Sequence, residues 1–418
     1  MDANEDRLSR IAALRPRSRV PLLPGSGPTS SSEKLVELLE GESRTNRLGG
    51  HIRVRRLLAQ PRACEMDPRA IRFLASDPVD SLCDSSQWLF LDTETTGLAG
   101  GTGTYAFLVG LAWWEGDGFT IEQYFMRDHS EEPSLLLEVL ERLGQRRVLV
   151  TFNGKSFDWP LLQTRYQMAR LGEIPKPLAH LDLLHPARRL WRLRLESVAL
   201  AQLERHILQL DRGQDIPSET IPQRYFDFLR GGPPDAMAEV FLHNQMDLRG
   251  LASLALHMSH ILADPEKSDC SAGELFGISR LLQTRGEERL AGRIYWRALQ
   301  RGLPEEAEHI AQRELAFLAK RGRDFELSNS LWEQLLEDPA EGFNAYEQLA
   351  IHYEHRASLP QKAALFSREA LVKLQEAFHA GRLSSHKYQQ WHARFQHRLD
   401  RITARAKNPQ VGSGNKEP

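Results

Sequence analysis

Residues 88–114 read WLFLDTETTGLAGGTGTYAFLVGLAWW, an apolar stretch that is interrupted by two acidic side chains. The run from Trp88 to Leu91 is typical of a buried strand. Asp92 and Glu94 lie two residues apart, so in a strand both carboxylates project from the same face. Like charges that are buried together need a partner, and a divalent cation suits oxygen ligands. Because such pairs are also common at solvated strand ends, the remaining chain must supply further carboxylates.

The composition is that of an ordinary globular protein. With 418 residues, 26% charged residues and a net charge of -2, two or three domains are expected, and any contact with nucleic acid must be local. The three cysteines form no CxxC pair, which argues against zinc and disulfides and favours a reducing cytoplasmic location. No apolar run is long enough for a transmembrane helix, and no signal peptide is expected. The cysteines are Cys64, Cys83 and Cys270.

The order of predicted elements indicates an α/β fold of the ribonuclease-H-like type. Three sequential antiparallel strands are followed by alternating helices and strands. The strands are predicted at residues 88–94, 105–114, 119–125, 148–152 and 180–184, with helices near 133–143 and 159–166. Such a mixed sheet would place the fourth strand beside the first.

A third carboxylate follows the fourth strand. Asn153 and Gly154 predict a turn, and Asp158 begins the next helix. An aspartate there also suits a helix N-terminus without any catalytic role. If strands one and four are neighbours, however, Asp158 opens on the same sheet edge as Asp92.

A fourth carboxylate lies on a long predicted helix that begins near residue 235. Asn244 and Asp247 fall on its apolar stripe, and His243 lies one turn before Asp247. A buried aspartate needs a partner, which could be a metal or a structural group. The preceding residues 209–234 are rich in loops and are predicted to cover the site.

Three motifs in this order resemble the DEDD exonuclease superfamily across about residues 88–258, and more closely the YprB-like branch, which joins a ribonuclease-H-like domain to tetratricopeptide (TPR) repeats. The motifs are FLDTETTGLAGGTGTYAFLVG, TFNGKSFDWPLL and HNQMDLRGLASL. The first is long and specific, and the three together make a chance match improbable.

The resemblance implies hydrolysis of a phosphodiester by a two-metal mechanism with two Mg²⁺ or Mn²⁺ ions. It assigns the metals to Asp92, Glu94, Asp158 and Asp247. It also suggests His243 as the general base. In one subgroup of the family a histidine lies five residues before the last aspartate, and in another a tyrosine lies four residues before it. This sequence departs from both patterns, because His243 lies four residues before Asp247. A metal-orienting or surface role for His243 therefore stays open.

The substrate expected from the resemblance is nucleic acid, single-stranded or a 3′ end, with no membrane partner. Thr95, Asn153 and Asn244 are the candidate substrate contacts. Asn153 and Asn244 could instead support the metal ligands, whereas Asp182 is expected to be structural. A 3′–5′ exonuclease follows from superfamily analogy alone. An endonuclease, or a scaffold that binds nucleic acid or protein without turnover, remains an alternative, and the sequence does not separate DNA from RNA.

A basic cluster follows the fifth strand. It consists of Arg188, Arg189, Arg192 and Arg194 around Trp191. These residues could bind phosphate and stack a base, or they could form a solvated helix face with the tryptophan packed inward. The second interpretation is favoured.

The C-terminal third shows an internal repeat at an offset of 36 residues. Trp296, Trp332 and Arg368 align, as do Leu281, Phe317 and Tyr353. This pattern resembles degenerate TPR repeats, which usually present a concave surface to a protein partner. A helical bundle that only braces the nuclease domain is the alternative.

The predicted organisation has five parts. These are a mostly disordered region 1–45 with one helix near 33–39, an accessory segment 46–86 with a strand near 50–55, a ribonuclease-H-like exonuclease domain 87–262, an all-α TPR-like repeat domain 273–405, and a disordered tail 406–418.

Overall fold

The computed structural model describes residues 28–63, 65–75, 82–97 and 102–407. The disorder predicted at both ends of the chain falls largely outside these residues, and so does Cys64. In the described part of the N-terminal region, a helix spans Pro28–Leu38 and a strand spans Glu42–Asn46, and Leu35 and Leu39 are buried in the core. This apolar anchoring joins the segment to the core of the sheet region.

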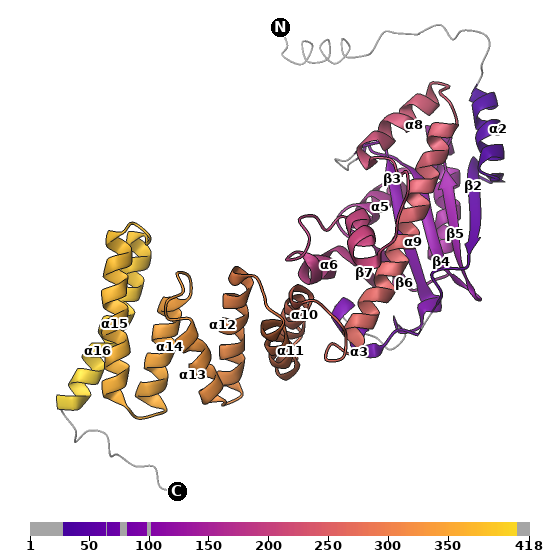
Figure 1. The fold of residues 1–418 in the computed structure, drawn as a ribbon. Helices are drawn as coiled ribbons and strands as arrows, with labels where there is room; N and C mark the ends of the chain where they lie inside the picture. Colours follow the sequence, from indigo (N-terminus) through magenta and orange to yellow (C-terminus); the bar gives the residue numbers. More distant parts are fainter. Residues whose placement is uncertain (1–27, 64, 76–81, 98–101, 408–418) are drawn as a thin grey trace, which may run out of the picture.

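In the part of the chain that the structure describes, one mixed sheet of seven strands forms the centre of the α/β region (Figure 1). Its spatial order is β1-β2-β5-β4-β3-β6-β7. The strands are β1 (Glu42–Asn46), β2 (Gly49–Leu58), β3 (Trp88–Thr95), β4 (Ala106–Glu115), β5 (Gly118–Phe125), β6 (Val148–Thr151) and β7 (Ala179–Asp182). The sheet and its alternating helices confirm the predicted ribonuclease-H-like fold class.

The strand pairing places the end of β6, which leads to Asp158, beside the acidic end of β3, as the sequence predicts. β3, β4 and β5 are sequential and antiparallel, whereas β6 runs parallel to β3, with Phe90 opposite Val150. β7 continues the parallel part beside β6. The expected accessory strand is β2, which pairs with β5 and so extends the same sheet together with β1.

Helices cover both faces of the sheet, which is why β3 is apolar on both sides. Trp88 and Phe90 pack into the cluster that contains the second half of α9, whereas Leu89 and Leu91 pack with α4 and α5. Asp92 and Glu94 continue the first set and therefore lie on the α9 side. The helices of this region are α2 (Pro28–Leu38), α3 (Pro68–Leu74), α4 (Glu132–Leu143), α5 (Asp158–Met168), α6 (Leu184–Trp191), α7 (Leu200–Leu203), α8 (Ile221–Leu229) and α9 (Asp235–Ala263).

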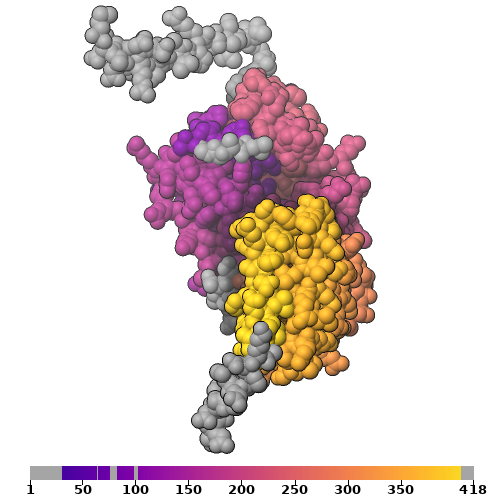
Figure 2. All heavy atoms as spheres, turned by 90° about the vertical axis from the view of Figure 1, so that its left-hand side faces the viewer, coloured from indigo at the N-terminus to yellow at the C-terminus, as the bar shows by residue number. Residues whose placement is uncertain are grey.

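The C-terminal region is an array of helices that extends away from the sheet (Figure 1). Its members are α10 (Ala272–Thr284), α11 (Glu288–Gln300), α12 (Glu305–Arg321), α13 (Phe325–Gln334), α14 (Gly342–His355), α15 (Pro360–His379) and α16 (Ser385–Lys407). Figure 2 looks along this array from its far end, where α15 and α16 form the outermost surface.

The 36-residue offset falls on equivalent helices. Trp296, Trp332 and Arg368 lie on α11, α13 and α15, the second helices of three neighbouring pairs. Their environments differ, however, because Trp332 is 1% exposed whereas Trp296 is 46% exposed. The helix pairs are thus repeated in the fold, and the assignment as TPR repeats stays a prediction.

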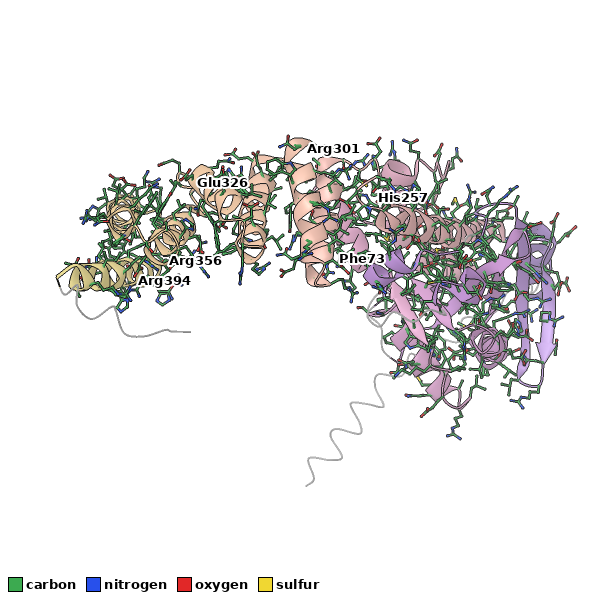
Figure 3. The ribbon with its side chains drawn as sticks, turned by 90° about the horizontal axis from the view of Figure 1, so that it is seen from below. Phe73, His257, Arg301, Glu326, Arg356 and Arg394 are labelled. Carbon is green, nitrogen blue, oxygen red and sulfur yellow. The ribbon has the colours of Figure 1, made fainter. Side chains whose placement is uncertain are left out.

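The predicted basic cluster lies where the two regions meet. Trp191 on α6 is completely buried, and its Nε1 donates to Glu274 Oε1 on α10 at 2.8 Å. This burial excludes base stacking by Trp191 and confirms the inward-packed interpretation. Its ring also stacks on that of His257 of α9, with centroids 6.1 Å apart, and Figure 3 shows His257 beside the first helices of the array.

Among the described residues, no helix combines the length and the apolar character that a membrane span requires.

Candidate metal and nucleic-acid site

The first part of the site is the pairing of Asp92 with Asn244. Asn244 Nδ2 donates to Asp92 Oδ2 at 2.7 Å, and Asn244 Oδ1 accepts from Gln123 Nε2 at 2.8 Å. α9 can approach this closely because Gly110 lies opposite Asp92 on β4. A Cβ atom at Gly110 would stand 2.2 Å from Asn244 Oδ1. Of the two roles that the sequence leaves open for Asn244, the structure favours support of a metal-binding carboxylate, because the side chain is fully buried and donates to Asp92.

Asp158 reaches the same place from the neighbouring strand. It is the first residue of α5 and is buried, and its Oδ1 accepts from Thr93 Oγ1 at 2.5 Å. The turn before it is fixed by Asp182, whose carboxylate accepts the backbone N–H groups of Asn153 and Lys155. Asp182 therefore has the structural role that the sequence suggested.

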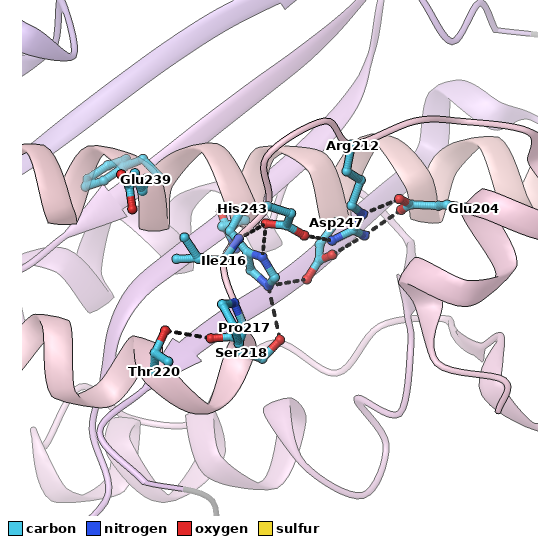
Figure 4. Close-up of polar contacts among 12 residues, drawn as sticks. Glu204, Arg212, Ile216, Pro217, Ser218, Thr220, Glu239, His243 and Asp247 are labelled. Atoms are coloured by element: carbon cyan, nitrogen blue, oxygen red, sulfur yellow. Dashed lines mark hydrogen bonds and ion pairs between the residues drawn. The ribbon is translucent and has the colours of Figure 1, made fainter.

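α9 and the loop before α8 bring a histidine–aspartate pair to the site (Figure 4). His243 Nδ1 donates to Asp215 Oδ1 at 2.7 Å. Its Nε2 lies 3.4 Å from Asp247 Oδ2 and 3.4 Å from Ser218 Oγ. Because His243 is buried, a helix-surface role is excluded. Residues 209–234 thus reach the site, as the loop-rich sequence predicted.

A single arginine connects Asp247 to two further carboxylates. Arg212 donates to Asp247 Oδ1, to Asp215 Oδ2 at 2.9 Å and to both oxygens of Glu204. Glu204 is buried at the start of a π-helical turn, residues 204–208. It faces Gly250 of α9, where a Cβ atom would stand 1.5 Å from Glu204 Oε1. Position 250 therefore requires glycine, because any side chain there would overlap the Glu204 carboxylate.

The carboxylates on and beside β3 repel one another. Burial raises the pKa of Asp92 and of Glu94 well above the usual carboxyl range, and the nearby Asp247 raises the pKa of both further. Burial also raises the pKa of Asp158 to about 6, against the opposing hydrogen bond from Thr93. For Asp215, burial raises the pKa, but hydrogen bonds from Arg212 and His243 outweigh it and hold the pKa below its usual value. The site thus contains excess negative charge that a cation would relieve.

The donor atoms fit a divalent cation. Among the described residues, one carboxylate oxygen each from Glu94 and Asp247 and a ring nitrogen of His243 lie within 4.8 Å of one another, so the two oxygens can share a cation that lies beside the imidazole. Carboxylate oxygens are the ligands that hard cations prefer. Asp247 can contribute Oδ2 while Oδ1 accepts from Arg212, an arrangement that is common because ligating carboxylates are usually held by hydrogen bonds of their own.

These side chains surround one open cavity of about 870 Å³. Its lining includes Asp92, Thr93, Asn153, Phe157, Asp158, Arg188, Arg212, Asp215, Ser218, His243 and Asp247. Asn153 is exposed there, in a left-handed backbone conformation with φ of 69°. Thr95 is buried instead, and its hydroxyl donates to the Gly97 carbonyl oxygen at 2.9 Å. Of the predicted substrate contacts, only Asn153 therefore lines the cavity.

Several residues of the site escaped sequence reasoning. Glu204, Arg212 and Asp215 precede the long helix in a loop-rich stretch, and their spacing follows no motif. Thr93 lies between the two acidic residues of β3, and the strand pattern alone assigns it no role. The usable signal was charge, because an arginine with flanking acidic residues before a helix that carries a buried aspartate predicts a partner for that aspartate.

A comparison with protein families agrees with this architecture. Residues 89–259 match the RNase_H superfamily, a nuclease-type fold. The family B DNA polymerase from the hyperthermophilic archaeon Pyrobaculum calidifontis has a TM-score of 0.34 and 16% sequence identity, over 49% of this chain and 29% of the polymerase. YprB of Bacillus subtilis (strain 168) is 32% identical over 286 residues, which are 68% of this chain and 68% of that protein. The chain that carries this site therefore belongs to the YprB family.

Proposed function

We propose that the chain is a metal-dependent nuclease, a 3′–5′ exonuclease that hydrolyses phosphodiester bonds of single-stranded nucleic acid. The observation that carries the proposal is the convergence of Asp92, Asp158 and Asp247 on one cavity, with Glu94 beside Asp247. Buried carboxylates with raised pKa values are the expected signature of a site that holds cations. Exonuclease action and its polarity rest on the family resemblance.

The four acidic residues would hold two Mg²⁺ or Mn²⁺ ions. Bound there, the ions would activate water and stabilise the charge that develops on the attacking and leaving oxygens. Asn244 fixes the rotamer of Asp92, and Arg212 fixes that of Asp247. The protein's contribution is therefore a rigid arrangement of ligands, which two-metal chemistry requires.

His243 is the proposed general base. Its Nδ1 proton is donated to Asp215, which leaves the Nε2 lone pair on the cavity side, next to Asp247. In the neutral ring, Nε2 can accept the proton of the attacking water as the water oxygen bonds to phosphorus and the bond from phosphorus to the 3′ oxygen breaks. Asp215 is a positioning residue in this step, because it fixes the tautomer of the ring.

Two features of the cavity favour a single strand. The cavity is open, and Phe157 contributes an aromatic side chain to its lining. Aromatic faces stack unpaired bases with little sequence preference. The backbone phosphates would then lie near the acidic residues.

The test is degradation of 5′-end-labelled single-stranded DNA and RNA with Mg²⁺ or Mn²⁺. We expect a metal-dependent ladder that a chelator abolishes and that Asp92→Asn reduces by at least about a thousandfold, since one ligand to the reaction centre is lost. Asp117→Asn, in the exposed turn between β4 and β5, is the matched control and should leave the rate unchanged.

The pattern of products discriminates between the alternatives. A ladder that shortens from the 3′ end supports the exonuclease, whereas internal fragments at the earliest times would show an endonuclease. Absence of cleavage of both polymers, with metal binding intact, would refute the proposal and favour a scaffold without turnover.

A further inference from the structure

Among the described residues that line the cavity, Arg188 is the arginine whose charge has no partner in the protein. It is exposed on α6, and it lines the cavity one helical turn after Leu184. Among the described residues, its guanidinium has no hydrogen-bond or ion-pair partner. In the other arginine of the lining, Arg212, all three guanidinium nitrogens donate to Glu204, Asp215 or Asp247. The guanidinium of Arg188 is therefore available to a ligand, whereas that of Arg212 is already paired within the protein.

The lining of the cavity is rich in negative charge, so an anionic ligand needs an unpaired cation in order to bind there. Five carboxylates are part of the lining, and only Arg188, Arg212 and a histidine oppose them in the described structure. A phosphodiester that enters is repelled by the carboxylates outside the immediate metal positions. An uncommitted guanidinium offers a fork of donors that matches two phosphate oxygens.

The helix that carries Arg188 is held from behind by the helical array. Trp191 and Arg194 both donate to Glu274 Oε1 on α10, at 2.8 and 3.3 Å. The helices touch at Gly277, where a Cβ atom would stand 2.2 Å from the Arg189 carbonyl oxygen and 2.7 Å from Leu190 Cα. Backbone contact of this kind leaves α6 no room to move toward α10, so its position depends on α10.

We infer that Arg188 binds a backbone phosphate of a single-stranded nucleic acid in this cavity, and that α10 of the helical array fixes the helix that presents it. The inference rests on the proposed function for the class of ligand. It adds a phosphate-binding position outside the metal ligands, and it makes the first helices of the array a structural part of the substrate site.

The first test is equilibrium binding of a fluorescein-labelled single-stranded oligonucleotide, measured by anisotropy in chelator so that no turnover occurs. Arg188→Gln should weaken binding about tenfold, the loss of one charge-assisted hydrogen bond. The slope of log K against log salt should fall by about 1, because one phosphate contact is lost. Arg189→Gln is the matched control, an exposed arginine on the same helix that is absent from the cavity lining.

The outcomes separate this inference from the proposed function. Weaker binding by Arg188→Gln, with Arg189→Gln unchanged, supports the phosphate contact even if no nuclease activity is found. Equal affinity of the two variants overturns it, even if the chain is an active nuclease. Failure of the parent protein to bind either DNA or RNA also overturns it.

The second test concerns the support from α10. Gly277→Ala introduces the backbone clash, whereas Gly273→Ala, on the same helix, meets no atom closer than 3.6 Å. We expect Gly277→Ala to weaken oligonucleotide binding at least about fivefold, since a displaced α6 loses the geometry of a charge-assisted contact. Gly273→Ala should bind like the parent. Parental affinity in Gly277→Ala would refute the role of α10.

Discussion

The close approach of Glu204 to Gly250 allows a quantitative prediction for Gly250→Ala. Gly250 lies within α9, where glycine costs roughly 0.5–1 kcal/mol relative to alanine, so the substitution should stabilise an unconstrained helix. Here the new Cβ would stand 1.5 Å from Glu204 Oε1 and 2.4 Å from its Cδ. The Glu204 carboxylate must therefore move away, and Arg212 loses its two hydrogen bonds to it.

The expected size of the effect follows from the burial of this ion pair. The side chains of Glu204 and Arg212 are 2% and 10% exposed, so the pair is screened little by water. Removing one partner of a buried pair costs about 3–5 kcal/mol, and the lower end applies because Arg212 keeps Asp215 and Asp247. After the gain in helix propensity, we expect Gly250→Ala to be destabilised by about 2 kcal/mol.

The assay is urea unfolding of the full chain, with Gly292→Ala as the control. Gly292 lies within α11, and its added Cβ meets nothing closer than 3.7 Å, so this variant should be stabilised by roughly 0.5–1 kcal/mol. Titration with Mn²⁺ supplies the functional readout, and Gly250→Ala should lose about tenfold in affinity because Asp247 is no longer held. If Gly250→Ala were as stable as Gly292→Ala and bound Mn²⁺ normally, the proposed role of Glu204 and Arg212 would be refuted.

Three further predictions concern the site and its support. In chelator, the free energy of unfolding should fall as pH rises from about 4 through about 6. The reason is the raised pKa of Asp158, because in this range the folded state keeps a proton that the unfolded state has released. Asp158→Asn should flatten this part of the pH–stability curve, which thermal unfolding measures. Asn244→Ala should lower Mn²⁺ affinity about 10–100-fold in calorimetry, since the carboxylate of Asp92 loses its donor, and an unchanged affinity would contradict the pairing. Trp191→Phe should cost about 2 kcal/mol in urea unfolding through the lost hydrogen bond to Glu274 and the smaller ring, and an unaltered midpoint would show that this junction contributes little.

The parts of the site that could be predicted from sequence are those carried by local patterns. Asp92 and Glu94 follow a strand that is apolar on both faces, and their spacing of two fixes a shared side. The order of strands placed β6 beside β3 and so brought Asp158 toward them. Asp247 lies on an apolar helical stripe, which predicts a charge that needs a partner, and the structure shows it half-buried. Each of these placements follows from the pattern of one helix or strand, together with the order of the strands in the sheet.

The remaining parts depend on contacts between segments that share no pattern. Glu204 sits in a π-helical turn, Arg212 in the loop beyond it, and their meeting with Asp247 is set by the missing side chain at Gly250. A glycine inside a predicted helix indicates a close approach, but the partner is not encoded nearby. The same holds for Gly110, whose role depends on Asn244, more than 100 residues later. Residue type alone also leaves two roles open for Asn244, and it is the hydrogen bond to Asp92 that favours support of a carboxylate over contact with substrate.

The two arginines of the cavity show why a residue's role follows from its partners. Arg212 is buried among three carboxylates, so its charge neutralises the protein's own acidic groups and fixes Asp247. Arg188 has the same guanidinium, but no described partner uses it, and it is exposed toward the cavity. An anion that displaced Arg212 from its carboxylates would lose about as much ion pairing as it gained, whereas an anion at Arg188 breaks no pair in the protein. Phosphate binding is therefore expected at Arg188, and the rigidity of the acidic site is expected to depend on Arg212.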